Sequence, residues 1–213
     1  MNLKEQLLEG LSELGISLIN NQIERLLDYL ILLEKWNKTY NLTAIQGLEK
    51  MLAYHLLDSL AIVPALKQCR NALDVGSGAG LPGVPLAIAL PHSTWTLLDS
   101  NGKKTRFMQQ ALAICKVSNA KVVKSRVQDY TAPQRFDIIV SRAYASLGDF
   151  ADSVAHLWQA GALLVTMKTE LDPREVREVD MIKHQIQPSQ IEEIKLRVPG
   201  IAAKRSLVTV KRS

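Results

Sequence analysis

The sequence has very little cysteine and no long apolar run. Its two cysteines, Cys69 and Cys115, have no metal-ligand spacing, which argues against a zinc site or a disulfide framework. No apolar stretch approaches the roughly 18 residues that a membrane-spanning helix needs, and the first ten residues mix leucines with charged side chains, unlike a signal peptide. We therefore expect reduced thiols, no metal, no membrane segment and a cytoplasmic location.

Acidic charge is also scarce over part of the chain. The 213 residues carry a net charge of +5, with 26 basic and 21 acidic side chains. Residues 1–70 are about neutral, whereas the segment from Asp99 to Arg142 holds nine basic residues against three acidic ones. A polyanionic partner such as RNA would explain this bias, although a solvated basic surface would give the same composition.

The pattern of apolar residues changes near residue 71. Leucines at helical spacing dominate residues 1–70, which predicts an N-terminal helical cap whose last long helix runs from Leu48 to Leu60. From residue 71 onward, short apolar runs alternate with helical segments, which is typical of βαβ units and a parallel sheet. Residues 71–213 are therefore predicted to form one α/β nucleotide-binding domain.

The end of this domain has a different connection. The predicted strands are Ala72–Val75, Thr94–Leu98, Lys121–Val123, Asp137–Ser141, Ala162–Met167, Ile191–Val198 and Ser206–Lys211. The predicted helices between the first four are Val84–Leu90, Lys103–Cys115 and a short stretch near Gln128. The last two strands are joined by a short loop without a helix, so they should pair as an antiparallel hairpin.

The strongest single motif is a glycine-rich turn after the first predicted strand. It reads Leu73-Asp74-Val75-Gly76-Ser77-Gly78-Ala79-Gly80-Leu81-Pro82-Gly83. Glycines let the backbone bend tightly and let a ligand approach main-chain N–H groups. An acid at the end of the next strand would hold ribose hydroxyls, and Asp99 follows Gly80 by 19 residues. This pair of features predicts a cofactor that contains a nucleoside.

The glycines fit two cofactor patterns. G-x-G-x-x-G begins at Gly78, as in dinucleotide-binding proteins, and D-x-G-x-G-x-G begins at Asp74, as in methyltransferases that use S-adenosylmethionine. The carboxylate of Asp74 would repel a pyrophosphate but suits the ammonium group of a methionine moiety, directly or through water. Prolines 82 and 85 also remove N–H donors that a pyrophosphate would use. We therefore predict S-adenosylmethionine as the cofactor and S-adenosylhomocysteine as its product.

The absence of two motifs limits which atom of a nucleic acid base this chain could methylate. Methylation of a pyrimidine at carbon 5 needs a covalent nucleophile, usually cysteine, and neither cysteine is predicted at the C-terminal edge of the sheet. Methylation of an exocyclic amine usually goes with an Asn/Asp-Pro-Pro-Tyr/Phe turn after the fourth strand, where this chain has Ser141-Arg142-Ala143-Tyr144. Guanine N7 needs neither device, because it has a free lone pair and no proton to remove.

Several polar side chains are candidates for contact with RNA. Arg142 follows the fourth strand and could contact the cofactor or a guanine edge, and Lys168 ends the fifth strand in the same topological position. The other candidates near the predicted cofactor are Lys103, Lys104 and Arg106 at the start of a helix, which could instead only solvate it. Asn41, after the second helix, could also face RNA, whereas His55 is interpreted as a packed residue that is not catalytic.

Several short segments run through nearly the whole chain in an order typical of one protein family. They are Trp36-Asn37-Lys38-Thr39-Tyr40-Asn41-Leu42-Thr43, His55-Leu56-Leu57-Asp58-Ser59, Leu73 to Pro85, Leu97-Leu98-Asp99-Ser100, Ser125-Arg126-Val127, Ser141-Arg142-Ala143 and Arg205-Ser206-Leu207-Val208. Together they closely resemble the bacterial RsmG family, once called glucose-inhibited division protein B (GidB). The resemblance is specific to the family and not only to its superfamily.

This resemblance implies a Rossmann-like class I methyltransferase fold with a seven-stranded, mostly parallel sheet. It implies an enzyme that methylates N7 of one guanine in the decoding-region loop of 16S ribosomal RNA in the small ribosomal subunit. By position, the cofactor contacts of the family fall on Gly76, Leu81, Val127, Gln128 and Arg142, and its sensitive basic positions on Lys103, Arg142, Lys168 and Arg205. Many members carry an acid where this chain has Gln128, and the amide oxygen could still accept from an adenine amine.

Two alternatives remain open from the sequence. One is a noncatalytic RNA-binding or ribosome-assembly factor that holds S-adenosylmethionine as a structural ligand. The other is an NAD-dependent oxidoreductase, which the register that begins at Gly78 would favour. A monomer is expected, and the sequence does not choose between free rRNA, an assembly intermediate and the mature subunit as substrate.

Overall fold

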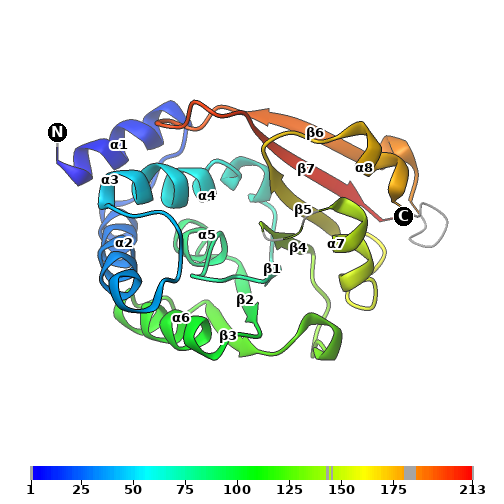
Figure 1. The fold of residues 1–213 in the computed structure, drawn as a ribbon, viewed down its shortest axis with the longest axis horizontal. Coiled ribbons are helices and arrows are strands. Elements are labelled where there is room, and N and C mark those ends of the chain that lie inside the picture. Colours follow the sequence, from blue (N-terminus) through cyan, green and yellow to red (C-terminus); the bar gives the residue numbers. More distant parts are fainter. Residues whose placement is uncertain (1, 143, 145, 180–185, 213) are drawn as a thin grey trace.

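The computed structural model describes residues 2–142, 144, 146–179 and 186–212, so Ala143 of the motif after the fourth strand lies outside the described residues. The described chain forms one seven-stranded sheet with the strand order β3-β2-β1-β4-β5-β7-β6 (Figure 1). The strands are β1 (Asn71–Val75), β2 (Thr94–Asp99), β3 (Ala120–Lys124), β4 (Ile138–Ser141), β5 (Leu163–Lys168), β6 (Ile191–Leu196) and β7 (Arg205–Lys211). Each predicted strand is therefore confirmed, with its ends shifted by at most two residues.

The sheet is parallel from β3 to β5 and antiparallel beyond it. β1 pairs in parallel with both β2 and β4. The chain therefore places β2 and β3 on one side of β1 and then crosses to place β4 and β5 on its other side. β7 runs antiparallel to β5 and to β6, which confirms the terminal hairpin. The loop of this hairpin covers residues 197–204 and is longer than predicted, because β6 already ends at Leu196.

Helices cover both faces of the sheet. The α-helices are α1 (Leu3–Glu13), α2 (Asn20–Tyr40), α3 (Leu48–Met51), α4 (Asp58–Leu60), α5 (Gly83–Ala89), α6 (Gly102–Ile114), α7 (Leu147–Val154) and α8 (Pro173–Glu178). Short 3₁₀ turns are η2 (Val63–Leu66), η3 (Val127–Asp129) and η4 (Pro188–Gln190). Figure 1 shows α1 to α6 on one side of the sheet and α7 on the other. Neither α7 nor α8 was predicted from the sequence.

The helix predicted from Leu48 to Leu60 has an unexpected middle. Between α3 and α4 the backbone forms a π-helical turn, η1 (Leu52–Leu57). Such turns are rare and often occur at functional sites, because the extra residue per turn re-aims neighbouring side chains. Here the turn carries His55 and leads directly into Asp58.

The N-terminal helices pack directly on the nucleotide-binding half. One hydrophobic cluster contains Leu7 and Leu30 of the helical cap together with Phe107 of α6 and Val140 of β4. At its border, the ring of Trp36 meets that of Phe107 edge-on with centroids 5.6 Å apart. Residues 1–70 and 71–213 thus share one continuous core on this face. A second cluster fills the opposite face beneath α7.

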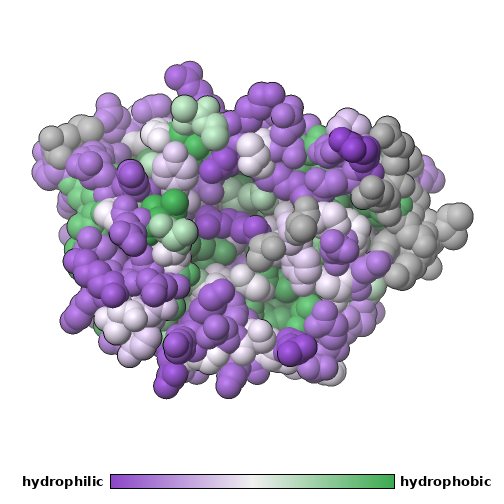
Figure 2. All heavy atoms as spheres, in the orientation of Figure 1, coloured by the Kyte–Doolittle hydropathy of each residue, from purple (hydrophilic) through white to green (hydrophobic). Residues whose placement is uncertain are grey.

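No helix in the described part of the chain is long and apolar enough to cross a membrane. Figure 2 shows that the face seen in Figure 1 is mostly hydrophilic, with hydrophobic atoms visible in a hollow near its centre. In the matching view of Figure 1, this hollow lies over the region where β1 and β4 end.

Candidate functional site

The glycine-rich turn wraps over the C-terminal ends of β1 and β2. The N–H groups of Gly76 and Ser77 both donate to the carbonyl oxygen of Leu98, at 2.8 and 3.0 Å. The backbone of Gly76 and Gly78 has φ angles of 69° and 60°, a left-handed region that residues with a Cβ rarely adopt. The turn therefore depends on glycine to hold its main chain open to a ligand.

Asp99 at the end of β2 fixes this turn from the side. Its Oδ2 accepts the N–H of Gly78 at 2.8 Å, and its Oδ1 accepts the N–H of Asn101 at 2.8 Å. A carboxylate has about four lone-pair sites, so each oxygen can accept a further hydrogen bond. Asp99 can thus hold the turn and still accept from two ribose hydroxyls.

A first cavity of about 420 Å³ opens between the glycine turn, Asp99 and the segment after β3. Its lining combines main chain, apolar and polar groups: Val75, Gly76, Leu98, Asp99, Ser100, Lys104, Ser125, Arg126, Val127, Gln128 and Tyr144. A ribose at Asp99 would leave room for a planar base beside Val127 and Gln128. The size and lining of this cavity fit a nucleoside cofactor.

Four of the predicted cofactor contacts line this cavity, and the others lie elsewhere. Gly76, Asp99, Val127 and Gln128 are in its wall. Gly78 donates to Asp99, while Gly80 and Leu81 lie behind the turn, where Leu81 is buried in the core and a Cβ on Gly80 would meet Val84. Ser100, Arg126 and Tyr144 line the cavity without having been predicted as contacts. Their position in the sequence, within two residues of Asp99, Val127 and Arg142, could have indicated them.

Asp74 lies underneath the turn and outside the lining of the cavity. Its side chain is fully buried, and its Oδ2 accepts the N–H of Gly83 at the start of α5, at 2.9 Å. Its Oδ1 has no hydrogen-bond partner among the described residues. Burial raises the pKa of this carboxyl to about 7. A contact between Asp74 and the ammonium group of a cofactor stays a prediction, and its visible role is to hold the turn against α5.

We expect Asp74 to make stability fall as the pH rises from about 4 to 7. In this window the folded protein keeps a proton on Asp74 that the unfolded chain releases, so the free energy of unfolding decreases with pH, by up to about 4 kcal/mol for a shift from 3.8 to about 7. Asp74→Asn keeps an acceptor for Gly83 but does not titrate, so its urea midpoint should lack this fall between about pH 4 and pH 7.

His55 also makes stability depend on pH, but its contribution rises with pH where that of Asp74 falls. Its pKa is lowered to about 4 by burial and by the charge of Arg142, so its own contribution to stability rises between about pH 4 and 6.5. Both proteins contain His55, so the difference between their midpoints isolates Asp74. Midpoints that run parallel across this pH range would contradict the assignment.

A second cavity of about 370 Å³ lies on the other side of the β1–β4 boundary. It is lined by the loop after α2, the π-helical turn and the ends of β4, β5 and β7: Thr43, Ile45, Tyr54, His55, Asp58, Arg142, Met167, Lys168, Thr169 and Arg205. Three basic residues predicted from distant segments, Arg142, Lys168 and Arg205, thus meet in one cavity. Arg142 lines this cavity and not the first one.

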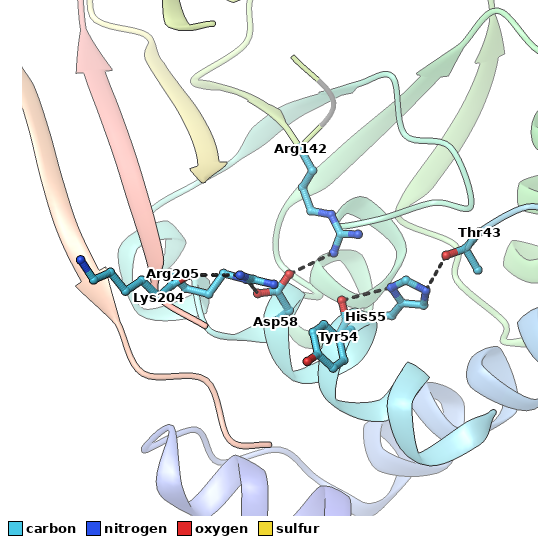
Figure 3. A network of polar contacts seen from close by, with 7 residues as sticks. All are labelled: Thr43, Tyr54, His55, Asp58, Arg142, Lys204 and Arg205. Atoms are coloured by element: carbon cyan, nitrogen blue, oxygen red, sulfur yellow. Dashed lines mark hydrogen bonds and ion pairs between the residues drawn. The ribbon is translucent and has the colours of Figure 1, made fainter. Parts of the chain in front are cut away.

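The basic side chains of this cavity are tied to carboxylates. Asp58 is buried between Arg142, whose Nη1 is 3.4 Å from its Oδ2, and Arg205, whose Nε is 3.1 Å from its Oδ1 (Figure 3). The Nζ of Lys168 is 2.6 Å from Oε2 of Glu175, which also accepts the N–H of Leu147. The carboxylates hold these cations in fixed positions at the wall of the cavity.

His55 forms part of the same wall as a neutral ring. Its Nδ1 lies 3.1 Å from the carbonyl oxygen of Tyr54, which can only accept, so Nδ1 carries the proton. Its Nε2 then accepts from the hydroxyl of Thr43 at 3.0 Å (Figure 3). The prediction that His55 is a packed, hydrogen-bonded residue is confirmed. The lone pair on its Nε2 is already engaged by the hydroxyl of Thr43.

The remaining predicted residues lie around these two cavities. Lys104 lines the first cavity, and Lys103 and Arg106 lie in the exposed first turns of α6. Asn41 ends α2 with a left-handed backbone and lines a third cavity, which is separate from the other two in its lining. Cys69 and Cys115 are buried, with pKa values raised to about 12 by burial, and neither lines the first or second cavity. Among the described residues no group of histidine, cysteine and acidic side chains could hold a metal ion.

Comparison with known proteins places these features in one family. A family model described as rRNA small subunit methyltransferase G matches residues 22–207. The ribosomal RNA small subunit methyltransferase G of Ectopseudomonas mendocina is 47% identical over 210 residues, covering 98% of this chain and 96% of that protein. The protein of the same name from Neisseria meningitidis serogroup C is 40% identical over 212 residues, and both chains are covered completely.

The fold is also shared with distant solved structures. The O-methyltransferase TomG from Streptomyces achromogenes, in complex with S-adenosylmethionine, is similar with a TM-score of 0.59 at 15% sequence identity. The match covers 87% of this chain and 90% of that chain. At this identity the similarity establishes the Rossmann-like class I methyltransferase fold.

Proposed function

Because the chain belongs to the rRNA small subunit methyltransferase G family, we propose that it methylates N7 of a single guanine in the decoding-region loop of 16S ribosomal RNA, with S-adenosylmethionine as the methyl donor. The observation that carries the proposal is the position of the two cavities. One is built like a nucleoside site, the other gathers Arg142, Lys168 and Arg205, and both flank the ends of β1 and β4. Ligands of open α/β sheets bind at this kind of switch point.

The first cavity would hold the cofactor through its nucleoside. Asp99 has acceptor sites left for the two ribose hydroxyls, and Val127 and Gln128 lie where the adenine would bind. The main chain at Gly76 is open to the methionine part. When bound, S-adenosylmethionine supplies an electrophilic methyl group. The residues of this chain orient that group towards the second cavity and exclude water.

The second cavity would receive the RNA nucleotide without a general base. Guanine N7 has a free lone pair, so transfer requires position and alignment and no removal of a proton. The cavity agrees with this requirement, because the Nε2 lone pair of His55 already accepts from Thr43. The two cysteines are buried as thiols outside both cavities, which does not favour a covalent mechanism at carbon 5 of a pyrimidine. The remaining role for this chain is to hold the guanine in line with the methyl group.

We expect methyl transfer to small ribosomal subunits that lack the modification. The protein is incubated with labelled S-adenosylmethionine and subunits from a strain without this protein, and N7-methylguanine is mapped by specific strand cleavage. The expected result is a single cleavage in the decoding-region loop. Subunits from the parent strain are the matched control and should accept almost no label, because their site is already methylated. Naked 16S rRNA, tested in parallel, identifies the form of the substrate.

Three other results would contradict the proposed function in different ways. Binding of S-adenosylmethionine without label transfer to subunits or naked rRNA would reject the enzyme and favour a noncatalytic RNA-binding factor. Label at another atom or in another loop would contradict guanine N7 of the decoding-region loop as the target, but it would support a methyltransferase activity. Retention of a nicotinamide dinucleotide after purification would favour the oxidoreductase.

A further inference from the structure

Asp58 joins two arginines that come from distant parts of the chain. Arg142 directly follows β4, and Arg205 begins β7. Figure 3 shows the side chain of Arg205 reaching the carboxylate of Asp58 from β7, and that of Arg142 reaching it from the segment after β4. His55 lies next to Asp58, and Thr43 lies beyond His55. The guanidinium of Arg205 is held at a second point, because its Nη1 donates to the carbonyl oxygen of Lys204 at 3.0 Å. Arg142 and Arg205 therefore have fixed positions relative to each other.

Stability alone does not explain this arrangement. A buried carboxylate loses its hydration, and in many proteins the attraction of its partners only compensates for that loss. The pKa of Asp58 is raised by burial, although both arginines act to lower it, which is consistent with a carboxylate that has lost much of its hydration. Charge attraction to RNA does not explain it either, because an acid in a basic cavity reduces the attraction for a polyanion.

We propose that Asp58 is a positioning residue, which fixes the guanidinium groups of Arg142 and Arg205 as one donor pair for the RNA nucleotide in the second cavity. This inference rests on the proposed function. Guanidinium groups present several N–H donors in a rigid plane, so their orientation determines which oxygens of the nucleotide they contact. Only one donor atom of Arg142 and one of Arg205 is used by Asp58, which leaves other donors of each group for RNA.

This role predicts an unusual change in kinetics when the charge of Asp58 is removed. Asp58→Asn keeps the shape of the side chain but makes the cavity more positive, so binding of the subunit should be equal or tighter. The two arginines lose their common anchor, and a misplacement of about 1 Å can cost about 100-fold in rate. We expect kcat to fall by about 30- to 100-fold, while KM for the small subunit stays unchanged or decreases.

The matched control is Glu170→Gln. Glu170 forms an exposed ion pair with Lys204 at 3.1 Å, and Lys204 precedes Arg205 in the sequence. Neither Glu170 nor Lys204 lines the second cavity. Its kcat should stay within about twofold of the wild type. For Asp58→Asn, binding of S-adenosylhomocysteine and the thermal unfolding midpoint are measured as well. Near-normal values there separate a positioning role from a loss of fold.

A double-mutant cycle tests whether Asp58 acts through Arg205. We expect Asp58→Asn combined with Arg205→Gln to be little worse than the more damaging single variant, because both remove the same arrangement. Losses that simply multiply, an unchanged kcat for Asp58→Asn, or a rise in KM alone would overturn the proposal. Wild-type protein that transfers no methyl group in this assay would overturn the proposed function instead, so the two failures are distinguishable.

A second variant covers the case in which Asp58→Asn does not fold. Arg205→Lys keeps both Asp58 and the positive charge but loses the planar fork. The expected result is again a fall in kcat, of at least about tenfold, with little change in KM. Arg205→Lys with wild-type kcat would contradict the proposal.

Discussion

Asp99→Ala is expected to weaken the binding of S-adenosylmethionine by about 100-fold or more. The variant removes the acceptor for the N–H of Gly78 and, in the proposed complex, the acceptors for two ribose hydroxyls. Hydrogen bonds to a charged group contribute about 1.5–3 kcal/mol each, so the loss of two of them corresponds to about 10²- to 10⁴-fold in affinity. Titration calorimetry with S-adenosylhomocysteine measures the effect directly.

Two further variants make this result specific. Asp129→Ala removes an exposed carboxylate at the end of η3. Asp129 itself does not line the first cavity, so this variant should bind the ligand like the wild type. Asp99→Asn keeps one acceptor oxygen and should give a smaller loss, of about tenfold. If folded Asp99→Ala bound S-adenosylhomocysteine within threefold of the wild type, the ribose would have to lie elsewhere.

Gly83→Ala is expected to lower the free energy of unfolding by about 3 kcal/mol. An added Cβ would lie 2.6 Å from Oδ2 of Asp74 and would also overlap Leu97, and both side chains are fully buried. The backbone of Gly83 is not in the left-handed region, so the effect is one of space. Overpacking of a core costs about 1–3 kcal/mol, and losing the hydrogen bond to Asp74 adds about 1–3 kcal/mol.

Urea unfolding at constant pH measures this change, with an unchanged slope showing that the folded state is otherwise the same. Gly102→Ala is the control, because that glycine also begins a helix but its added Cβ would meet only the flexible end of Lys124. Its midpoint should be equal to the wild type or higher, since alanine favours helix more than glycine does. Equal midpoints for the two variants would show that the contact between Asp74 and α5 is not tight.

Much of the fold could be predicted from local patterns in the sequence. The alternation of apolar runs and helical segments predicted the parallel strands, and the short helix-free loop after Val198 predicted the antiparallel hairpin. These features depend on periodicity and on turn residues, which are encoded within short windows. The helices α7 and α8 were not predicted, and the π-helical turn within the predicted helix from Leu48 to Leu60 has no simple sequence signal.

The predicted cofactor site also depends on features that lie within short stretches of sequence. The glycine turn and Asp99 belong to neighbouring parallel strands, so their meeting at one edge follows from the topology. Asp74 was read from the same motif, but the sequence could not show that its carboxylate points down onto Gly83 and away from the cavity lining. That direction depends on how α5 packs against β1.

By itself, the sequence determined the class of fold, the family and the cofactor turn, because each is written in contiguous residues at fixed spacing. Only the tertiary structure decided that Asp58, Arg142 and Arg205 form one cluster, since Asp58 and Arg205 are 147 residues apart. The order of β4, β5 and β7 in the sheet and the π-helical turn before α4 bring these residues together. Contacts of this kind depend on how every intervening element packs, and no local pattern specifies them.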